Sequence, residues 1–183
     1  YYKDISESTP LPMVVYNIQL AGLMDMDLLL KLAALPNVHG LKYTARSHDE
    51  MGFIKEKLGP DFMIYSGCDE MAFSGMCSGA DGIIGSFYNL FPDLYKQILK
   101  KVEESDIKGG MRLQRIADEV IFAALKYGFP SILHNMMNWR GLDSGYSRRP
   151  FYNYQDSELE GLKEDIRRIR DRYQAEELDM FRL

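Results

Sequence analysis

Two residues with side chains suited to carbonyl chemistry lie in short apolar segments, Lys42 within residues 39–44 and Tyr16 within residues 12–17. A lysine in a barrel interior suits imine formation, because burial disfavours the ammonium form and leaves more free amine to attack a carbonyl. A phenol on a neighbouring strand can relay a proton between a substrate hydroxyl and the imine, provided it lies within hydrogen-bonding distance. The two residues therefore suggest Schiff-base chemistry.

Each candidate also has a simpler interpretation. A lysine beside an apolar run is more often a strand-end residue whose amine reaches solvent, and Tyr16 could be a core aromatic residue. Asp69 and Glu70 could form the acidic first turn of a helix, and Ser86 could cap the helix that follows it. The three histidines lack the spacing of metal ligands, so we expect no metal site.

The apolar segments alternate with helical patterns along the first half of the chain. Segments rich in strand-forming residues occupy 12–17, 39–44, 62–67 and 80–86, and helical patterns occupy 26–35, 48–58 and 71–78. This alternation predicts an α/β fold with a parallel sheet, in which the residues that end the strands share one rim. The residues expected at that rim are Tyr16, Asn17, Lys42, Thr44, Ser66, Gly67, Asp69, Glu70 and Ser86.

The second half of the chain contains only helical patterns. Apolar faces recur at helical spacing, at Leu90, Leu94, Ile98 and Val102, at Leu113, Ile116, Val120 and Ala124, and at Leu159, Leu162, Ile166, Ile169 and Tyr173. Breaks are expected at Gly109-Gly110, at Gly128 to Pro130 and over 141–150. We therefore divide the chain into a sheet-containing part, residues 1–106, and a helical extension, residues 107–183.

Composition narrows the class of protein. The 183 residues are 46% hydrophobic, enough for a substantial core, and the net charge of −5 with scattered basic residues disfavours a nucleic-acid partner. The two cysteines form no disulfide framework, and no apolar run approaches the length of a membrane span, so we expect a cytoplasmic protein. Because the chain opens with Tyr1 rather than methionine, we expect a fragment.

Five segments together resemble the N-acetylneuraminate lyase and dihydrodipicolinate synthase superfamily of class I aldolases. They are LPMVVYN (11–17), GLKYT (40–44), SGCDE (66–70), GADGIIGSFYN (79–89) and RRPF (148–151), in the order that this family shows. The resemblance implies a (β/α)8 barrel, of which this chain would supply the C-terminal half, about four parallel strands with their helices, followed by a helical extension. It also implies a homotetramer for the intact family.

The same resemblance assigns roles to individual residues. Lys42 matches the lysine that forms the imine with pyruvate, and Tyr16 matches the tyrosine that carries the proton. The positions that match contacts to the sugar portion of the substrate are Thr44, Gly67, Asp69, Glu70 and Ser86, and Tyr2 matches a tyrosine of the fourth barrel strand. The implied reaction is reversible cleavage of N-acetylneuraminate to N-acetylmannosamine and pyruvate, which requires neither a metal nor an organic cofactor.

Two alternatives remain beside this reading. A related pyruvate-dependent aldolase, such as dihydrodipicolinate synthase or a keto-deoxy sugar acid aldolase, would share the imine step, although the Asp69-Glu70 pair argues modestly against the synthase. The family's Gly-Thr/Ser-Thr-Gly-Glu loop, which holds the substrate carboxylate, has no counterpart here. A catalytically inactive module that binds or oligomerises is therefore the other alternative, since half a barrel has open sheet edges.

We expect a strand stub around Tyr2 and no helix before Pro12, because too few residues separate them for a crossover helix.

Overall fold

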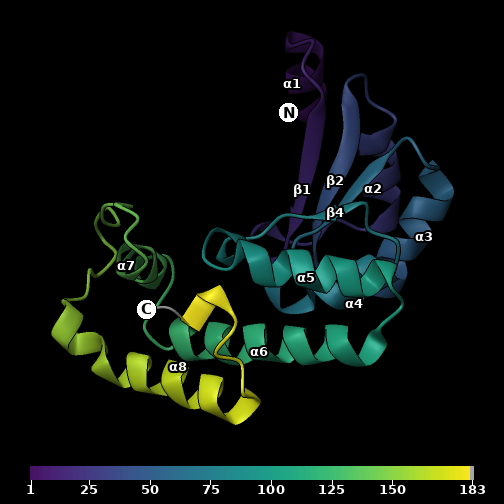
Figure 1. The fold of residues 1–183 in the computed structure, drawn as a ribbon. Helices are drawn as coiled ribbons and strands as arrows, with labels where there is room; N and C mark the ends of the chain where they lie inside the picture. Colours follow the sequence, from purple (N-terminus) through teal and green to yellow (C-terminus); the bar gives the residue numbers. More distant parts are fainter. Residues whose placement is uncertain (182–183) are drawn as a thin grey trace. The chain divides into compact units, whose positions relative to one another are not determined.

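The computed structural model describes residues 1–181, and the chain divides into two compact units, Tyr1–Gly85 and the part from Ser86 onwards (Figure 1). The first unit contains four strands, β1 (Met13–Ile18), β2 (Val38–Thr44), β3 (Met63–Ser66) and β4 (Gly82–Ile83). Its helices are α1 (Tyr2–Ser8), α2 (Met26–Ala33), α3 (His48–Leu58) and α4 (Ala72–Cys77).

The four strands form one parallel sheet in the order β1-β2-β3-β4, which confirms the expected α/β class. The first three strands lie within a residue of their expected bounds. The fourth is shorter than the expected segment 80–86, because β3 ends at Ser66 and offers β4 only two aligned partners. Backbone bonds from Asp81 N to Ile64 O and from Ile84 N to Ser66 O extend this short pairing at both ends.

One face of the sheet is closed by helices. Val15, Leu41 and Ile64 are aligned on neighbouring strands, and all three are buried. The remaining members of the core cluster come from the helices, from other positions on β2 and from the adjoining loops: Leu29, Leu32, Val38, Tyr43, Ala45, Met51, Ile54 and Ala80. Because side chains alternate along a strand, the residues between these core positions face the other way.

The N-terminal segment corrects the expectation of a strand stub. Tyr2 begins helix α1, and its side chain packs against the core cluster. The side-chain amide of Asn37 donates to the carbonyls of Ser6 and Thr9, and the Ser6 hydroxyl donates to the carbonyl of Pro36. These bonds fix α1 to the turn that precedes β2, so the helix expected to be missing before β1 is present.

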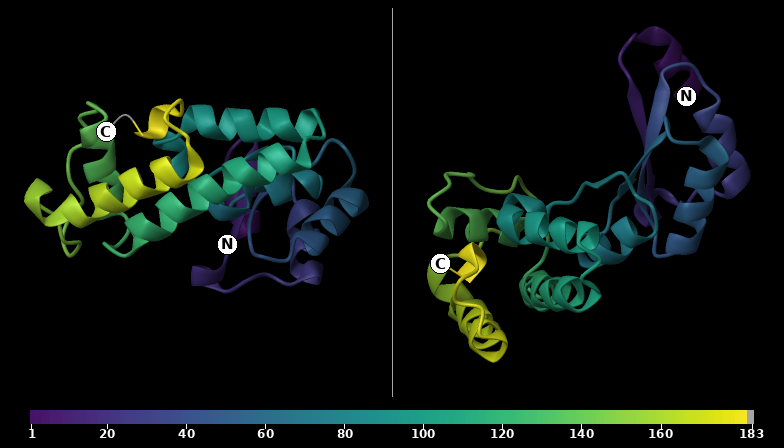
Figure 2. Two further views of the ribbon diagram at one scale, coloured as in Figure 1. Left: turned by 60° about the horizontal axis from the view of Figure 1, so that its bottom comes forward. Right: turned by 45° about the vertical axis from the view of Figure 1, so that its right-hand side comes forward.

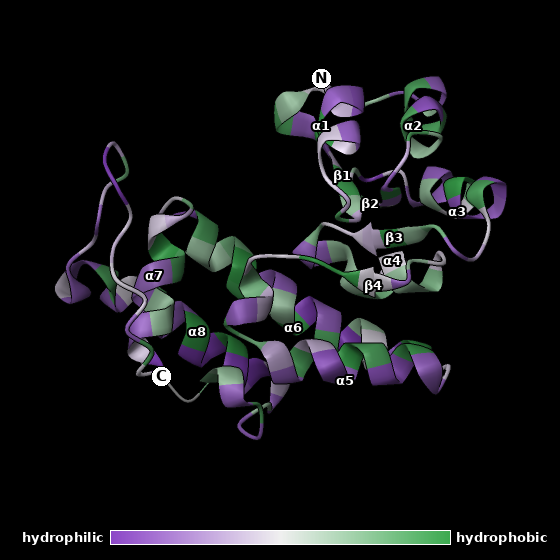
Figure 3. Ribbon diagram, turned by 90° about the horizontal axis from the view of Figure 1, so that it is seen from above, coloured by the Kyte–Doolittle hydropathy of each residue, from purple (hydrophilic) through white to green (hydrophobic). Residues whose placement is uncertain are grey.

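The second unit is helical, as expected, with α5 (Pro92–Glu103), α6 (Ile107–Leu125), α7 (Ser131–Trp139) and α8 (Glu160–Tyr173) (Figure 2). Helix α6 packs against α5, α7 and α8. Hydrophobic and hydrophilic residues alternate along α5 and α6 (Figure 3), and the expected apolar faces are buried apart from the half-buried Val102 and Tyr173. None of the helices within residues 1–181 is long and apolar enough to cross a membrane.

Two details of this unit differ from expectation. Gly109-Gly110 is not a break, because Asp106 caps α6 by accepting a hydrogen bond from Gly109 N, and the helix runs through both glycines. Helix α7 was not anticipated. It begins at Ser131, directly after the break that was expected at Gly128 to Pro130.

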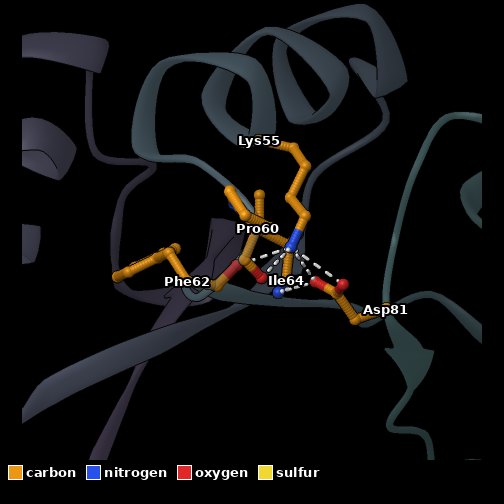
Figure 4. Close-up of polar contacts among 5 residues, drawn as sticks. All are labelled: Lys55, Pro60, Phe62, Ile64 and Asp81. Atoms are coloured by element: carbon orange, nitrogen blue, oxygen red, sulfur yellow. Dashed lines mark hydrogen bonds and ion pairs between the residues drawn. The ribbon is translucent and has the colours of Figure 1, made fainter.

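A partly buried ion pair joins elements of the first unit at the N-terminal ends of β3 and β4 (Figure 4). The Lys55 ammonium donates to both carboxylate oxygens of Asp81, at 2.8 and 2.9 Å, and to the carbonyls of Pro60 and Phe62. Asp81 also accepts from Ile64 N at 2.7 Å. Both charged side chains are about four-fifths buried, so this pair joins α3, the loop before β3 and the start of β4.

We expect Lys55→Met to destabilise the first unit by about 1–2 kcal/mol, because the Asp81 carboxylate and two backbone carbonyls lose the donor that Lys55 supplies. Urea unfolding followed by circular dichroism measures this change. The matched control is Lys3→Met, which removes the exposed Lys3–Glu7 pair and should cost at most about 0.5 kcal/mol. Equal effects of the two substitutions would contradict a structural role for the Lys55–Asp81 pair.

A second stability prediction concerns His48, whose Nδ1 lies 3.1 Å from the Ser74 hydroxyl. Burial lowers the pKa of His48, against smaller raising effects from Ser74 and Asp49. The unfolded state therefore binds more protons below about pH 6.5, and stability is lost as the pH falls through this range. His48→Gln should flatten that loss, measured as the difference between urea midpoints at about pH 7.5 and about pH 5; an unchanged pH dependence would exclude His48 as its source.

Candidate active site

Lys42 and Tyr16 lie side by side on the face of the sheet opposite the core. Their Cα atoms are aligned in the parallel register of β1 and β2, so the two side chains leave the sheet on the same side. The Lys42 ammonium nitrogen lies 4.2 Å from the centroid of the Tyr16 ring, within the range of a cation–π contact. Tyr16 is 41% exposed and Lys42 is half-buried, so this face of the first unit is accessible.

The two residues that flank Lys42 on β2 face the core, on the opposite side of the sheet from Lys42. Leu41 and Tyr43 point into the core, where they are almost completely buried. The Tyr43 hydroxyl donates to Glu50 Oε2 at 2.6 Å, and burial together with the Glu50 carboxylate raises the pKa of Tyr43 well above its usual value. Tyr43 therefore anchors β2 to α3, while Lys42 and Thr44 face the accessible side.

Thr44 and Gly67 form a close contact at the C-terminal ends of β2 and β3. The Thr44 Oγ1 is buried and makes no hydrogen bond within the described part of the chain. A Cβ added to Gly67 would overlap that oxygen and would lie 3.1 Å from the Tyr43 carbonyl. Gly67 N donates to the same carbonyl at 2.8 Å. The glycine is therefore required by the close approach of Thr44, which leaves a buried polar atom beside the site.

The acidic pair lies just beyond β3, in the 3-10 turn Asp69–Met71. The Asp69 carboxylate lies against the Cα of Gly85, where any Cβ would overlap it, so this carboxylate is close to the end of the β4 segment. Burial raises the pKa of the neighbouring Cys68 thiol, assisted by the carboxylates of Glu70 and Asp69 and opposed by the charges of Arg46 and Lys42. Cys68 is thus a neutral thiol among charged groups, a neighbour that the sequence did not single out.

Two expected site residues are not part of the strands of this sheet. Tyr2 is in α1 and packs against the core, away from the face that carries Lys42. Ser86 is the first residue of the second unit, where its carbonyl accepts hydrogen bonds from the backbone and side-chain amides of Asn89. The geometry of the first unit therefore brings together Lys42, Tyr16 and Thr44 on one face, with Gly67, Asp69 and Glu70 at its C-terminal edge.

Sequence reasoning missed one residue in the same row. Tyr65 of β3 is aligned with Lys42 on the side opposite Tyr16, and it is half-buried. Its segment is only four residues long, and the two-residue alternation alone does not say which of its faces is buried. The register with β2 was the missing signal.

Within residues 1–181, no group of three or more His, Cys, Asp or Glu side chains is placed to hold a metal ion.

Comparison with known proteins agrees with this arrangement. The model of the dihydrodipicolinate synthetase family matches residues 1–169. The chain belongs to this family. Curated relatives include the N-acetylneuraminate lyases of Escherichia coli, 36% identical over 167 residues, and of Rhizobium meliloti, 31% identical over 168 residues. These alignments cover 89% and 91% of the chain but 56% of each relative, so the chain spans little more than half of their length.

Solved structures of the dihydrodipicolinate synthetase family share the fold. The N-acetylneuraminate lyase of Mycoplasma synoviae is 32% identical, with a TM-score of 0.80 over 95% of this chain and 58% of that chain. The sialic acid aldolase of Ruminococcus gnavus is 27% identical, with a TM-score of 0.85 over 95% of this chain and 60% of that one. The four-stranded parallel sheet and its helices are therefore an arrangement that the family shares.

The contact between Thr44 and Gly67 yields a stability prediction. We expect Gly67→Ala to destabilise the first unit by about 1–3 kcal/mol, because its methyl group overlaps the Thr44 hydroxyl. In a Thr44→Ala background the same substitution should cost less, giving a coupling of at least about 0.5 kcal/mol in a double-mutant cycle measured by urea unfolding. Additive effects would show that Gly67 is not required by Thr44.

Proposed function

We propose that the chain carries the Schiff-base centre of a class I aldolase that acts on 2-oxo acids, of the N-acetylneuraminate lyase type. The observation that carries this proposal is the Lys42 amine 4.2 Å from the Tyr16 ring, on aligned positions of adjacent strands and on an accessible face. A nucleophilic amine next to a phenol that can exchange protons is the pair that imine chemistry needs. The names of the curated relatives support the same class of reaction.

The proposed cleavage begins when the Lys42 amine attacks the C2 carbonyl of the open-chain sugar acid and water leaves, giving a protonated imine. Tyr16, whose own proton left with that water, then accepts the proton of the C4 hydroxyl, and the C3–C4 bond breaks as its electron pair moves into the imine. N-acetylmannosamine departs, and the enamine left on Lys42 is protonated at C3. Hydrolysis of the resulting imine releases pyruvate and restores the amine.

The surroundings of the pair support a polyhydroxylated substrate. Thr44 presents a buried hydroxyl without a hydrogen-bond partner among the described residues, and Asp69 and Glu70 place carboxylates at the C-terminal edge of the sheet. A buried polar atom of this kind is satisfied when a ligand supplies the partner. We therefore assign Thr44, Gly67, Asp69, Glu70 and Ser86 to the sugar portion of the substrate, and we give Tyr2 no part in it.

We further propose that the sheet is the C-terminal half of a (β/α)8 barrel, with the barrel portion at residues 1–106 and the helical extension at 107–183. In support, Lys42 and Tyr16 lie on the face that points inward in a closed barrel, and apolar side chains such as Val14, which is 43% exposed, share that face. Such a face calls for a covering partner, either the remaining strands of the family barrel or further copies in a homo-oligomer.

Trapping of the imine tests the proposal. Incubation with pyruvate and borohydride should give a reduced pyruvate adduct, which peptide mass spectrometry should locate on Lys42. Lys42→Ala should abolish the adduct, whereas Lys96→Ala, which removes an exposed lysine of the second unit, should retain it. Tyr16→Phe should still form the adduct but lower the rate of carbon–carbon cleavage by about 100-fold or more, because the proton acceptor is lost.

The outcomes separate the competing functions. Cleavage of N-acetylneuraminate supports the lyase, and condensation of pyruvate with another aldehyde supports a related aldolase. Absence of an adduct on Lys42, both in the chain alone and after addition of the N-terminal half of a relative, would contradict the enzyme proposal and favour an inactive binding module.

A further inference from the structure

The aligned row on the accessible face continues past Lys42 to a second tyrosine and then to a glycine. Tyr65 of β3 is the register partner of Lys42, and Gly82 of β4 is the register partner of Tyr65. Adjacent strands lie about 4.8 Å apart, so Lys42 stands between two aromatic residues, Tyr16 on one side and Tyr65 on the other.

The side chains of Lys42 and Tyr65, which are neighbours in this row, incline in opposite directions. The Lys42 amine lies over the Tyr16 ring, towards β1. The Tyr65 ring inclines towards β4, because a Cβ added to Gly82 would lie only 3.3 and 3.4 Å from its Cδ1 and Cε1 atoms. Gly82 thus leaves room for the ring, and the side chains of Lys42 and Tyr65 diverge.

We propose that Tyr65 is a specificity-determining residue, whose ring bounds on the β3 side the space through which a carbonyl compound reaches the Lys42 amine, with Gly82 setting the inclination of the ring. The inference rests on the proposed function in so far as the compound is a 2-oxo acid. The role belongs to the ring, because the Tyr65 hydroxyl makes no hydrogen bond within the described residues, whereas the ring contacts the backbone at Gly82.

Two opposite consequences follow from this geometry. A smaller residue at position 65 removes the wall and admits bulkier carbonyl compounds to Lys42. A larger residue at position 82 takes the space that the ring occupies and moves it towards Lys42, which excludes bulkier compounds. Tyr65→Phe keeps the ring and is the matched control.

Reductive alkylation measures this selection without requiring aldolase activity. The amine and an aldehyde form an imine with loss of water, and cyanoborohydride supplies the hydride that reduces it to a stable secondary amine. Formaldehyde serves as the small reagent and 4-carboxybenzaldehyde as the bulky one, with peptide mass spectrometry to quantify labelling at Lys42. Lys96, whose side chain is 77% exposed, is the internal reference for the reactivity of each reagent.

The measured quantity is the ratio of bulky to small labelling at Lys42, normalised to Lys96. We expect Tyr65→Ala to raise this ratio about tenfold and Gly82→Val to lower it by a similar factor, as expected when the size of a pocket changes. Tyr65→Phe should keep the wild-type ratio. Circular dichroism and urea midpoints verify that each variant is folded, and Gly82→Ala replaces Gly82→Val if the latter unfolds.

An unchanged ratio in folded Tyr65→Ala, or an equal rise in Tyr65→Phe, would overturn the proposal. The result is independent of the pyruvate experiment. A shifted ratio without a pyruvate adduct would uphold the role of Tyr65 and reject the aldolase function. A pyruvate adduct with an unchanged ratio would support the aldolase function and reject the role of Tyr65.

Discussion

The parallel register of β1, β2 and β3 is the constraint on which the candidate site depends. It aligns Tyr16, Lys42 and Tyr65 in one row and sends all three side chains to the face opposite the core. Because side chains alternate along a strand, a slip of one residue in β2 would turn Lys42 into the core and Leu41 out of it. Such a slip is opposed because it would expose the apolar Leu41 and bury the charged Lys42, so the core fixes the position of the Lys42 amine.

Stability and chemistry occupy opposite ends of the sheet. At the N-terminal ends of the strands, Lys55 and Asp81 join a helix, a loop and two strands through hydrogen bonds. At the C-terminal ends, Thr44 leaves a buried hydroxyl without a partner among the described residues, and carboxylates follow β3 directly. In parallel strand-helix folds this division lets the loops at one end change without loss of the scaffold.

Membership of the dihydrodipicolinate synthetase family accounts for the scaffold, but a fold hosts several chemistries. The specific inference of imine chemistry comes from the contact between Lys42 and Tyr16, and the inference of selectivity comes from Tyr65 and Gly82. In the second unit the apolar faces of α5, α6 and α8 are buried, and α6 packs against the other two helices. The accessible face of the sheet in the first unit is the surface on which the proposed function rests.

The sequence by itself predicted most of the elements and the candidate pair of Lys42 and Tyr16. Alternation of apolar segments with helical patterns was strong enough to place β1, β2, β3 and α3 within about a residue, because each has a periodicity that its own residues define. Lys42 and Tyr16 were singled out because a lysine and a phenol in strand-like segments are suited to carbonyl chemistry, and the structure places them side by side. The short helix α1 and the helical Gly109-Gly110 pair were missed, because they depend on hydrogen bonds that Asn37 donates and that Asp106 accepts rather than on local propensity. Only the tertiary structure placed Tyr65 beside Lys42 and Gly67 against Thr44, since strand register and close approach between strands are fixed by packing of residues distant in the chain.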